Sequence, residues 1–214
     1  VRVIEQLAGV ALPASLWESQ VLPARVRDYA PGMLEELIAT GTVLWSGHGR
    51  LGDNDGLVAF HLHEFAAETL LPPPDAVSAF HLSALQQELL GSLANGGAYF
   101  VRQLASLVAT RRQGEPAPTP SDIGEALWSL VWSGHVTADT WSPVRAYCNA
   151  RPARRPRAIQ TSRRRRGLGS RAYEDRMSAA ISSMTSVATL GDATLAGRWS
   201  LLSPEPMNDT ARAL

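Results

Sequence analysis

The feature that most constrains the fold is a run of helix and strand signals between residues 11 and 62. Apolar residues recur at helical spacing in LPASLWESQVL, residues 12–22, which predicts a first helix. A second helix is predicted over 31–40, because Pro31 suits a first helical turn and Gly41 suits a cap at the other end. The region therefore begins with two short helices.

Two strand signals follow these helices, over 42–46 and 57–62. Between them lies the polar, glycine-rich stretch GHGRLGDNDG, which is typical of an exposed hairpin tip. Two helices followed by a hairpin with a long tip are the order of a winged helix. We therefore predict a winged-helix module over residues 1–70.

A helix-to-strand unit occurs twice in the chain. Both copies read Leu-x-x-Leu-x-x-x-Gly-x-Val when they are aligned by their cap glycines. The copies are Leu34, Leu37, Gly41 and Val43, and Leu127, Leu130, Gly134 and Val136. The repeat predicts a second winged-helix-like module, richer in helix, over residues 71–150.

The letters WSGH also occur twice, but they align six residues out of register with this repeat. In the first copy, Trp45 is expected on a strand after the cap glycine. In the second, Trp132 is expected on the helix before it. The shared letters are therefore a coincidence, and the two tryptophans are expected in unrelated environments.

The whole pattern predicts a mostly α chain with small β-hairpins, of the α+β class. After the tandem winged-helix modules we expect an Arg-rich linker over 151–176. A β segment over 177–214, which includes the strand signal GRWSLL, is expected to begin a following domain. Both ends of the chain are expected to be cuts within a longer protein.

Charge is concentrated in the linker. The 214 residues have no net charge, yet the window 151–176 holds ten arginines and two carboxylates. Arginine binds phosphate in a bidentate manner, so this window is the leading candidate for contact with nucleic acid. Its candidate residues are Arg151, Arg154, Arg155, Arg157, Arg163, Arg164, Arg165, Arg166 and Arg171. The alternative is a solvated loop, or one docked on the chain's own acidic surface.

The tip of the first hairpin is a second candidate, because it carries His48 and Arg50. Winged helices commonly place the preceding helix in a major groove and the wing over the backbone. The outward face of that helix offers Glu35, Glu36 and Thr40, and acidic groups repel phosphate. We therefore expect the helix to pack against another domain or subunit, and Arg50 to contact nucleic acid.

Other candidate groups indicate structural roles. His61 and His63 alternate on one strand, but no second ligand pair accompanies them, so half-exposed histidines are expected and no metal site is predicted. The tryptophans at 128, 132 and 141 are expected in a core rather than stacked on bases. Cys148 is the single cysteine; it is expected to be inert, and it fits a reducing compartment.

Some function classes are excluded or not expected. No apolar run approaches the roughly 20 residues of a membrane span, and no secretory signal is expected. The chain has no lysine, so the phosphate-binding loop G-x-x-x-x-G-K-[ST] is impossible. We therefore expect no ATP hydrolysis and no cofactor in this segment.

Several separated blocks of the chain resemble one family in the same order. They are LPARVRDYAPGMLEELIATGTVLWSGHGRLGDNDGLVAFH, GGAYFVRQL, EALWSLVWSGHVTADTWSPVRA, the Arg-rich stretch and GRWSLL. Over almost the whole chain they are similar to the C-terminal region of large helicase-related (Lhr) proteins of the actinobacterial type. The resemblance implies a fragment of a much longer, ATP-dependent DNA repair helicase.

The resemblance also implies what surrounds the fragment. An N-terminal motor, with ATP and Mg²⁺, translocates 3′ to 5′ on single-stranded DNA. The C-terminal region contains tandem winged helices and a β-barrel, and in some relatives it is associated with oligomerisation or uracil excision. No ATPase residue carries over to this chain, because the motor motifs are absent.

A glycosylase needs a polar group that positions water beside a flipped base. The related winged-helix glycosylases use a Gln-apolar-Gln motif, whereas Gln86 and Gln87 are adjacent here. The carboxylates available are Asp53, Asp55, Asp122 and Asp139. Each has a plainer expected role as a turn or cap residue.

We therefore expect a non-catalytic segment of an Lhr-type helicase that guides nucleic acid, forms homo-oligomers, or does both. The alternative is part of a glycosylase-like, uracil-excising domain. Expected partners are single-stranded or tailed duplex DNA, the protein's own motor domains and a second copy, with no membrane. The expected location is the cytoplasm, at the nucleoid.

Overall fold

The computed structural model describes residues 1–70, 82–112, 118–150 and 193–202. The predicted α+β class is confirmed, since short helices accompany two three-stranded antiparallel sheets. All nine candidate arginines of the Arg-rich window lie outside the described residues.

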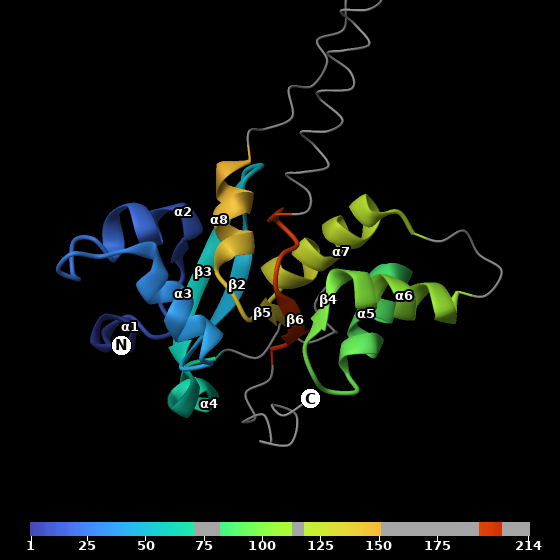
Figure 1. Cartoon of the computed structure of the whole chain (residues 1–214), viewed down its shortest axis with the longest axis horizontal. Coiled ribbons are helices and arrows are strands. Elements are labelled where there is room, and N and C mark those ends of the chain that lie inside the picture. The colour runs from blue at the N-terminus through green and yellow to red at the C-terminus, as the bar shows by residue number, and fades with distance from the viewer. Residues whose placement is uncertain (71–81, 113–117, 151–192, 203–214) are drawn as a thin grey trace, which may run out of the picture.

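The elements of residues 1–70 have the arrangement of a winged helix (Figure 1). Its elements are α1 (Arg2–Gln6), β1 (Leu12–Pro13), α2 (Ala14–Leu16), η1 (Trp17–Val21), α3 (Pro31–Ala39), β2 (Val43–Leu51), β3 (Asp55–Leu62), η2 (His63–Phe65) and α4 (Ala66–Thr69). The strands form a sheet in the order β1-β3-β2. In this arrangement α3 has the position of the recognition helix of a winged helix, which we call the groove helix. The β2–β3 hairpin is the wing.

Local sequence explains the ends of α3 and the core behind it. Pro31 begins the helix, and Gly41 follows it with a φ of +72°, a left-handed conformation that favours glycine. Behind the sheet, the indole N–H of Trp17 donates to the carbonyl of Val58 at 2.9 Å. The Trp17 ring also packs edge-on against Phe60, with ring centroids 4.7 Å apart.

The second module has a similar order of elements. They are α5 (Ala84–Leu93), β4 (Tyr99–Phe100), α6 (Val101–Arg111), α7 (Pro120–Trp132), β5 (Val136–Ala138), α8 (Ser142–Asn149) and β6 (Arg198–Leu201). Unlike the first module, it has α8 inserted between its last two strands. Its strands form a sheet in the order β4-β6-β5, which matches the order β1-β3-β2 of the first module. In the second module α7 is therefore the groove helix, and β5 and β6 are the wing strands.

Capping side chains fix the helix ends of this module. Ser83 and Gln86 form a capping box at the start of α5, and Thr119 and Asp122 form another at the start of α7. Gly134 ends α7 with a φ of +76°, as its counterpart Gly41 ends α3. The predicted repeat therefore corresponds to two equivalent helix-to-strand units.

The position of β6 corrects one expectation. Residues 177–214 were expected to begin a following domain, whereas β6 pairs with both β4 and β5 and so completes the sheet of the second module. The Arg-rich window, expected as a linker between domains, therefore lies within the connection between the two wing strands. The module boundary at 70/71 stays a prediction, since residues 71–81 are not described.

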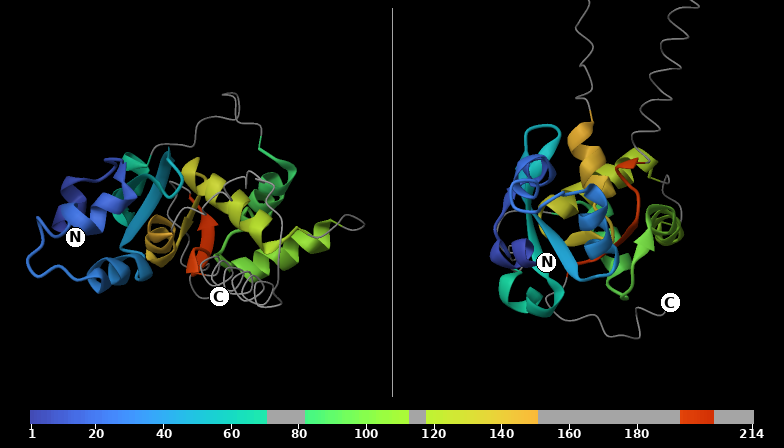
Figure 2. Two further views of the ribbon diagram at one scale, coloured as in Figure 1. Left: turned by 90° about the horizontal axis from the view of Figure 1, so that it is seen from above. Right: turned by 60° about the vertical axis from the view of Figure 1, so that its left-hand side comes forward.

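The two modules lie side by side (Figure 2), with α7 and β5 against β2 and α8 against α2. Across the described residues, no helix combines the length and the apolar character that crossing a membrane requires.

Candidate nucleic-acid interface

One residue on the outward face of α3, Glu35, contacts the second module. The hydroxyl of Thr140 and the backbone N–H of Trp141 both donate to Oε1 of Glu35, the latter at 3.1 Å. Arg145 Nη1 lies 3.4 Å from the other carboxylate oxygen of Glu35. The expected packing of this face against another domain is therefore met at Glu35, whereas Glu36 and Thr40 are exposed.

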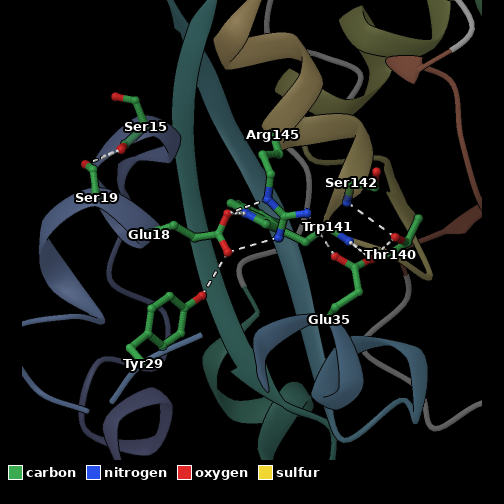
Figure 3. A network of polar contacts seen from close by, with 9 residues as sticks. All are labelled: Ser15, Glu18, Ser19, Tyr29, Glu35, Thr140, Trp141, Ser142 and Arg145. Carbon is green, nitrogen blue, oxygen red and sulfur yellow. Dashed lines mark hydrogen bonds and ion pairs between the residues drawn. The ribbon is translucent and has the colours of Figure 1, made fainter. Parts of the chain in front are cut away.

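Glu18 links the same two modules through Arg145 (Figure 3). Arg145 donates Nε to Glu18 Oε2 at 2.7 Å and Nη2 to Oε1 at 2.9 Å, which is a bidentate pair. Trp141 Nε1 and the Tyr29 hydroxyl also donate to Glu18, at 3.1 and 2.8 Å. We call Glu18, Glu35, Trp141 and Arg145 the inter-module clamp.

The surroundings of the inter-module clamp keep its donors, Arg145 and the neighbouring Tyr29, protonated. Hydrogen bonding to Glu18 raises the pKa of Arg145 above its ordinary value. Burial, together with the hydrogen bond to Glu18, raises the pKa of the Tyr29 phenol well above its usual range. Both groups therefore stay protonated at physiological pH and keep donating to the Glu18 carboxylate.

The second groove helix, α7, is covered by the first wing. A Cβ atom at Gly47 would overlap the backbone carbonyl of Val131, and one at Gly56 would overlap the Trp132 ring. The Trp132 ring also contacts Trp128 and Tyr147, with centroids 5.1 and 5.2 Å away. The end of α7 therefore lies directly against the wing hairpin, where only glycine fits.

The expected core role of Trp128, Trp132 and Trp141 is confirmed, because their exposed fractions are 7%, 8% and 1%. Trp45 and Trp132 lie on a strand and a helix, as predicted, but their environments are related, because both lie at the contact between the modules. Among the described residues, the buried indole N–H of Trp132 has no hydrogen-bond partner.

The two groove helices meet the opposite module to different extents. Gly47 of the first wing lies against the end of α7. Its counterpart in the repeat, Thr140, lies in the loop between β5 and α8 and donates to Glu35 on α3. The first wing thus covers the end of α7, whereas the second module contacts α3 at Glu35 and leaves Glu36 exposed.

Arg50, the described member of the candidate residues, lies exposed near the tip of the first wing. Its Nε and Nη2 donate to the carbonyls of Gly52 and Asp53 at 2.9 and 3.0 Å. The stretch GHGRLG has the spacing of a dinucleotide-binding fingerprint, but it lies in a hairpin rather than at the start of a helix. The tip therefore offers an exposed guanidinium and no such cradle.

Asn54 joins this tip to the end of α8, a contact that sequence reasoning missed. Its side-chain amide donates to the carbonyls of Cys148 and Ala150, both at 3.2 Å. Arg151, the first arginine of the Arg-rich window, follows Ala150 directly. The wing tip that carries Arg50 thus holds Ala150, the residue before the window, although 100 positions of sequence separate the two.

His61 corrects another expectation, since it is fully buried rather than half exposed. Its Nδ1 lies 2.9 Å from the Thr69 hydroxyl, which donates to the carbonyl of Phe65. Nδ1 therefore carries the proton, and Nε2 accepts from the Ser46 hydroxyl at 2.7 Å. The same hydroxyl lies 2.7 Å from His48 Nε2, which must then donate to it.

Burial, with a smaller contribution from His48, lowers the pKa of His61 to about 4. Both rings are therefore neutral at physiological pH, and the chain of hydrogen bonds is structural. The described residues hold no group of three or more side chains of the metal-binding type.

Three of the four carboxylates considered for base excision take part in local contacts. Asp55 accepts from the Ser15 hydroxyl at 2.6 Å, Asp122 accepts from the Thr119 hydroxyl, and Asp139 pairs with Arg198 at 2.7 Å. Burial raises the pKa of the Cys148 thiol to about 12, so the thiol is unreactive near neutral pH, as expected.

Together, the order of elements, the strand order and the wings define a tandem winged-helix unit. Residues 1–63 match the family described as the winged-helix domain of the large helicase-related protein. The chain belongs to the large helicase-related (Lhr) family as a segment of a longer protein, which confirms the resemblance noted from its sequence.

Two relatives match essentially the whole chain. It is 50% identical over 213 residues to the Lhr helicase/uracil glycosylase of Escherichia coli. It is 41% identical over 215 aligned positions to the Lhr helicase/probable uracil glycosylase of Mycolicibacterium smegmatis. The chain spans 13% of the length of each relative, and the matches show the family rather than an actinobacterial subtype.

Proposed function

We propose that this chain is a non-catalytic, C-terminal segment of an Lhr-type helicase that guides single-stranded or tailed duplex DNA for the motor. The observation that supports this best is the pairing of the Arg50 wing tip with the end of α8, through Asn54. The ten arginines that follow α8 would therefore leave the fold beside an exposed guanidinium. Phosphate contact by Arg50 and the Arg-rich window is the proposed mode of binding.

The two groove helices support a wing-based mode. The exposed Glu36 on α3 would repel phosphate, and the end of α7 is packed against the first wing. Contacts to phosphates carry no sequence information by themselves. We therefore propose sequence-independent binding, as a motor that moves along DNA requires.

The remaining parts of the proposal concern the whole protein. ATP and Mg²⁺ would act in its motor domains, and these domains would be partners of this segment. The whole protein would translocate 3′ to 5′ on DNA during repair, in the cytoplasm at the nucleoid. Homo-oligomer formation is a second proposed role. Uracil excision appears in the names of both relatives, but we do not propose it for this segment, because Asp55, Asp122 and Asp139 form local structural contacts.

Fluorescence anisotropy with labelled single-stranded DNA, measured across a range of salt concentrations, tests this proposal. We expect binding with a steep salt dependence in the whole 214-residue chain. Changing Arg163, Arg164, Arg165 and Arg166 to serine should reduce the slope of log K against log salt by up to about 3.

The matched control changes Arg25 and Arg27 to serine, because both are exposed on the loop before α3. That variant should keep the wild-type slope. Absence of binding at low salt would refute the guiding role. A concentration-dependent mass that is insensitive to Arg163–Arg166 would instead support assembly.

A further inference from the structure

Two phenylalanines of the described chain are about half exposed. Phe100 has an exposed fraction of 52% and Phe65 one of 43%. They lie in different modules, Phe100 at the end of β4 and Phe65 in η2. Arginines lie near Phe100, whereas carboxylates lie near Phe65. This difference in charge indicates a binding role for Phe100 alone.

Phe100 stands beside an arginine on the outer face of the second sheet. It pairs directly with Arg198 of β6, and directly opposed residues of an antiparallel pair project from the same face. The next pair, Tyr99 and Trp199, projects from the other face, where Trp199 is fully buried. Phe100 and Arg198 are therefore neighbours on the outward surface.

The guanidinium of Arg198 can donate hydrogen bonds to a further acceptor. Its side chain is 51% exposed and donates Nε to Asp139 at 2.7 Å. Among the described residues, no partner contacts its two Nη atoms. Asp139 thus fixes one edge of the guanidinium and leaves the other edge available.

A second arginine lies close to Phe100 along the chain. Arg102 is exposed in the first turn of α6, and Gln103 in the same turn accepts from the backbone N–H of Phe100 at 2.8 Å. The sequence of α6, VRQLASLVATR, contains no carboxylate. We call Phe100, Arg102 and Arg198 the Phe100 face.

The charged residues near Phe65 are negative, unlike the arginines near Phe100. Glu64 precedes it and Glu68 follows three residues later, and both are exposed. A phosphate near Phe65 would meet two carboxylates, whereas a phosphate near Phe100 would meet Arg102 and the Nη edge of Arg198, whose Nε is paired with Asp139. The chain therefore contains its own matched control for an exposed aromatic ring.

We propose that the Phe100 face binds single-stranded nucleic acid, with a base stacked on the Phe100 ring and flanking phosphates on Arg102 and Arg198. Aromatic stacking combined with basic side chains is a general means of holding single strands, because every base has a π-face. A duplex hides those faces, so the proposal specifies a single strand. It rests on the proposed guiding function and adds a contact outside the Arg-rich window.

Anisotropy with the whole chain and labelled oligothymidylate tests the proposal. Phe100→Ala should weaken binding about fivefold or more, whereas Phe65→Ala should leave it unchanged. Arg102→Ser should lower the salt slope by about 0.7, the value for one phosphate contact on a single strand. Oligouridylate, measured in parallel, distinguishes RNA from DNA as the preferred strand.

Two controls separate the possible failures. Thermal melting verifies the fold, and if Phe100→Ala melts early, Arg102→Ser becomes the deciding variant, because its side chain is exposed. Wild-type affinity in both the Phe100→Ala and Arg102→Ser variants would overturn this inference, while loss of binding in the Arg163–Arg166 variant would still support the guiding function. Absence of binding by the wild-type chain would refute both proposals.

Discussion

The indole N–H of Trp45 donates to the backbone carbonyl of Ala138 at 3.0 Å, across 93 positions of sequence. The same offset relates the two copies of the helix-to-strand unit, so Trp45 and Ala138 are equivalent positions in the repeat. A contact between equivalent positions lies near the axis that relates two copies. The Thr137 hydroxyl also donates to the Trp45 carbonyl, at 2.8 Å.

The tandem modules thus resemble a symmetric dimer formed within one chain. In such a contact each partner supplies the same surface, and here the first wing packs against α7 while Thr140, after β5, donates to Glu35 on α3. The outcome is one body in which the groove helices hold the modules together. This arrangement leads to the following predictions.

Substitution at Gly47 should separate the wing from α7. Gly47→Ala would place a Cβ atom onto the Val131 carbonyl, which is backbone and cannot rotate away, so we expect a loss of about 3 kcal/mol in the free energy of unfolding. Gly32→Ala is the control, because nothing lies within 4 Å of its Cβ position. In helix α3 the control should be neutral or stabilising by up to about 1 kcal/mol. Urea unfolding measures both variants, and equal midpoints would contradict the proposed contact.

Removing the clamp cation should destabilise the contact between the modules. Arg145→Met leaves the carboxylates of Glu18 and Glu35 without their shared partner. We expect a loss of about 2 kcal/mol, less than for a fully buried pair, since the side chains are partly exposed. Arg27→Met, at an exposed position, should change stability by less than about 0.5 kcal/mol. Indistinguishable urea midpoints for the two variants would show that the clamp does not stabilise the fold.

Acid should destabilise the fold through His61. Its pKa is lowered to about 4 in the folded state, so the unfolded chain binds the proton more readily. The contribution of His61 to the free energy of unfolding is therefore fully present above about pH 6.5, the ordinary histidine pKa. It falls by on the order of 2–3 kcal/mol as the pH decreases towards 4. His61→Asn should flatten this pH dependence, while the exposed His63→Asn should retain it. Urea unfolding at several pH values measures this dependence. If the free energy of unfolding changes with pH equally in His61→Asn and in the unchanged chain, this role of His61 is contradicted.

Loss of the Asn54 amide should loosen the end of α8. Asn54→Asp keeps the shape but replaces the donor to Cys148 and Ala150 with an acceptor. We expect hydrogen exchange to accelerate over residues 146–150, with a loss of about 1 kcal/mol in stability. Asn95→Asp, in an exposed turn, is the control and should not alter exchange there. Unchanged protection in Asn54→Asp would mean that the wing tip does not hold α8.

The sequence by itself determined the local elements of both modules. Pro31 and Gly41 bound α3, Thr119 and Asp122 cap α7, and the repeated leucines bury the inner helix faces. These signals depend on periodicity and capping over a few residues, so they can be recognised without knowledge of the rest of the fold. The acidic outer face of α3 likewise predicted a protein partner for Glu35.

Only the tertiary structure decided which distant segments meet. The pairing of β6 with β4 and β5, the burial of His61 and the bonds from Asn54 to the end of α8 each depend on elements that are separate in sequence. A residue's own pattern sets which face of its helix or strand it occupies, but the element packed on that face sets its burial, its hydrogen-bond partners and its pKa. The sequence therefore indicated two modules, whereas their packing determined that the end of α7 is covered by the first wing and that the wing tip with Arg50 stays exposed.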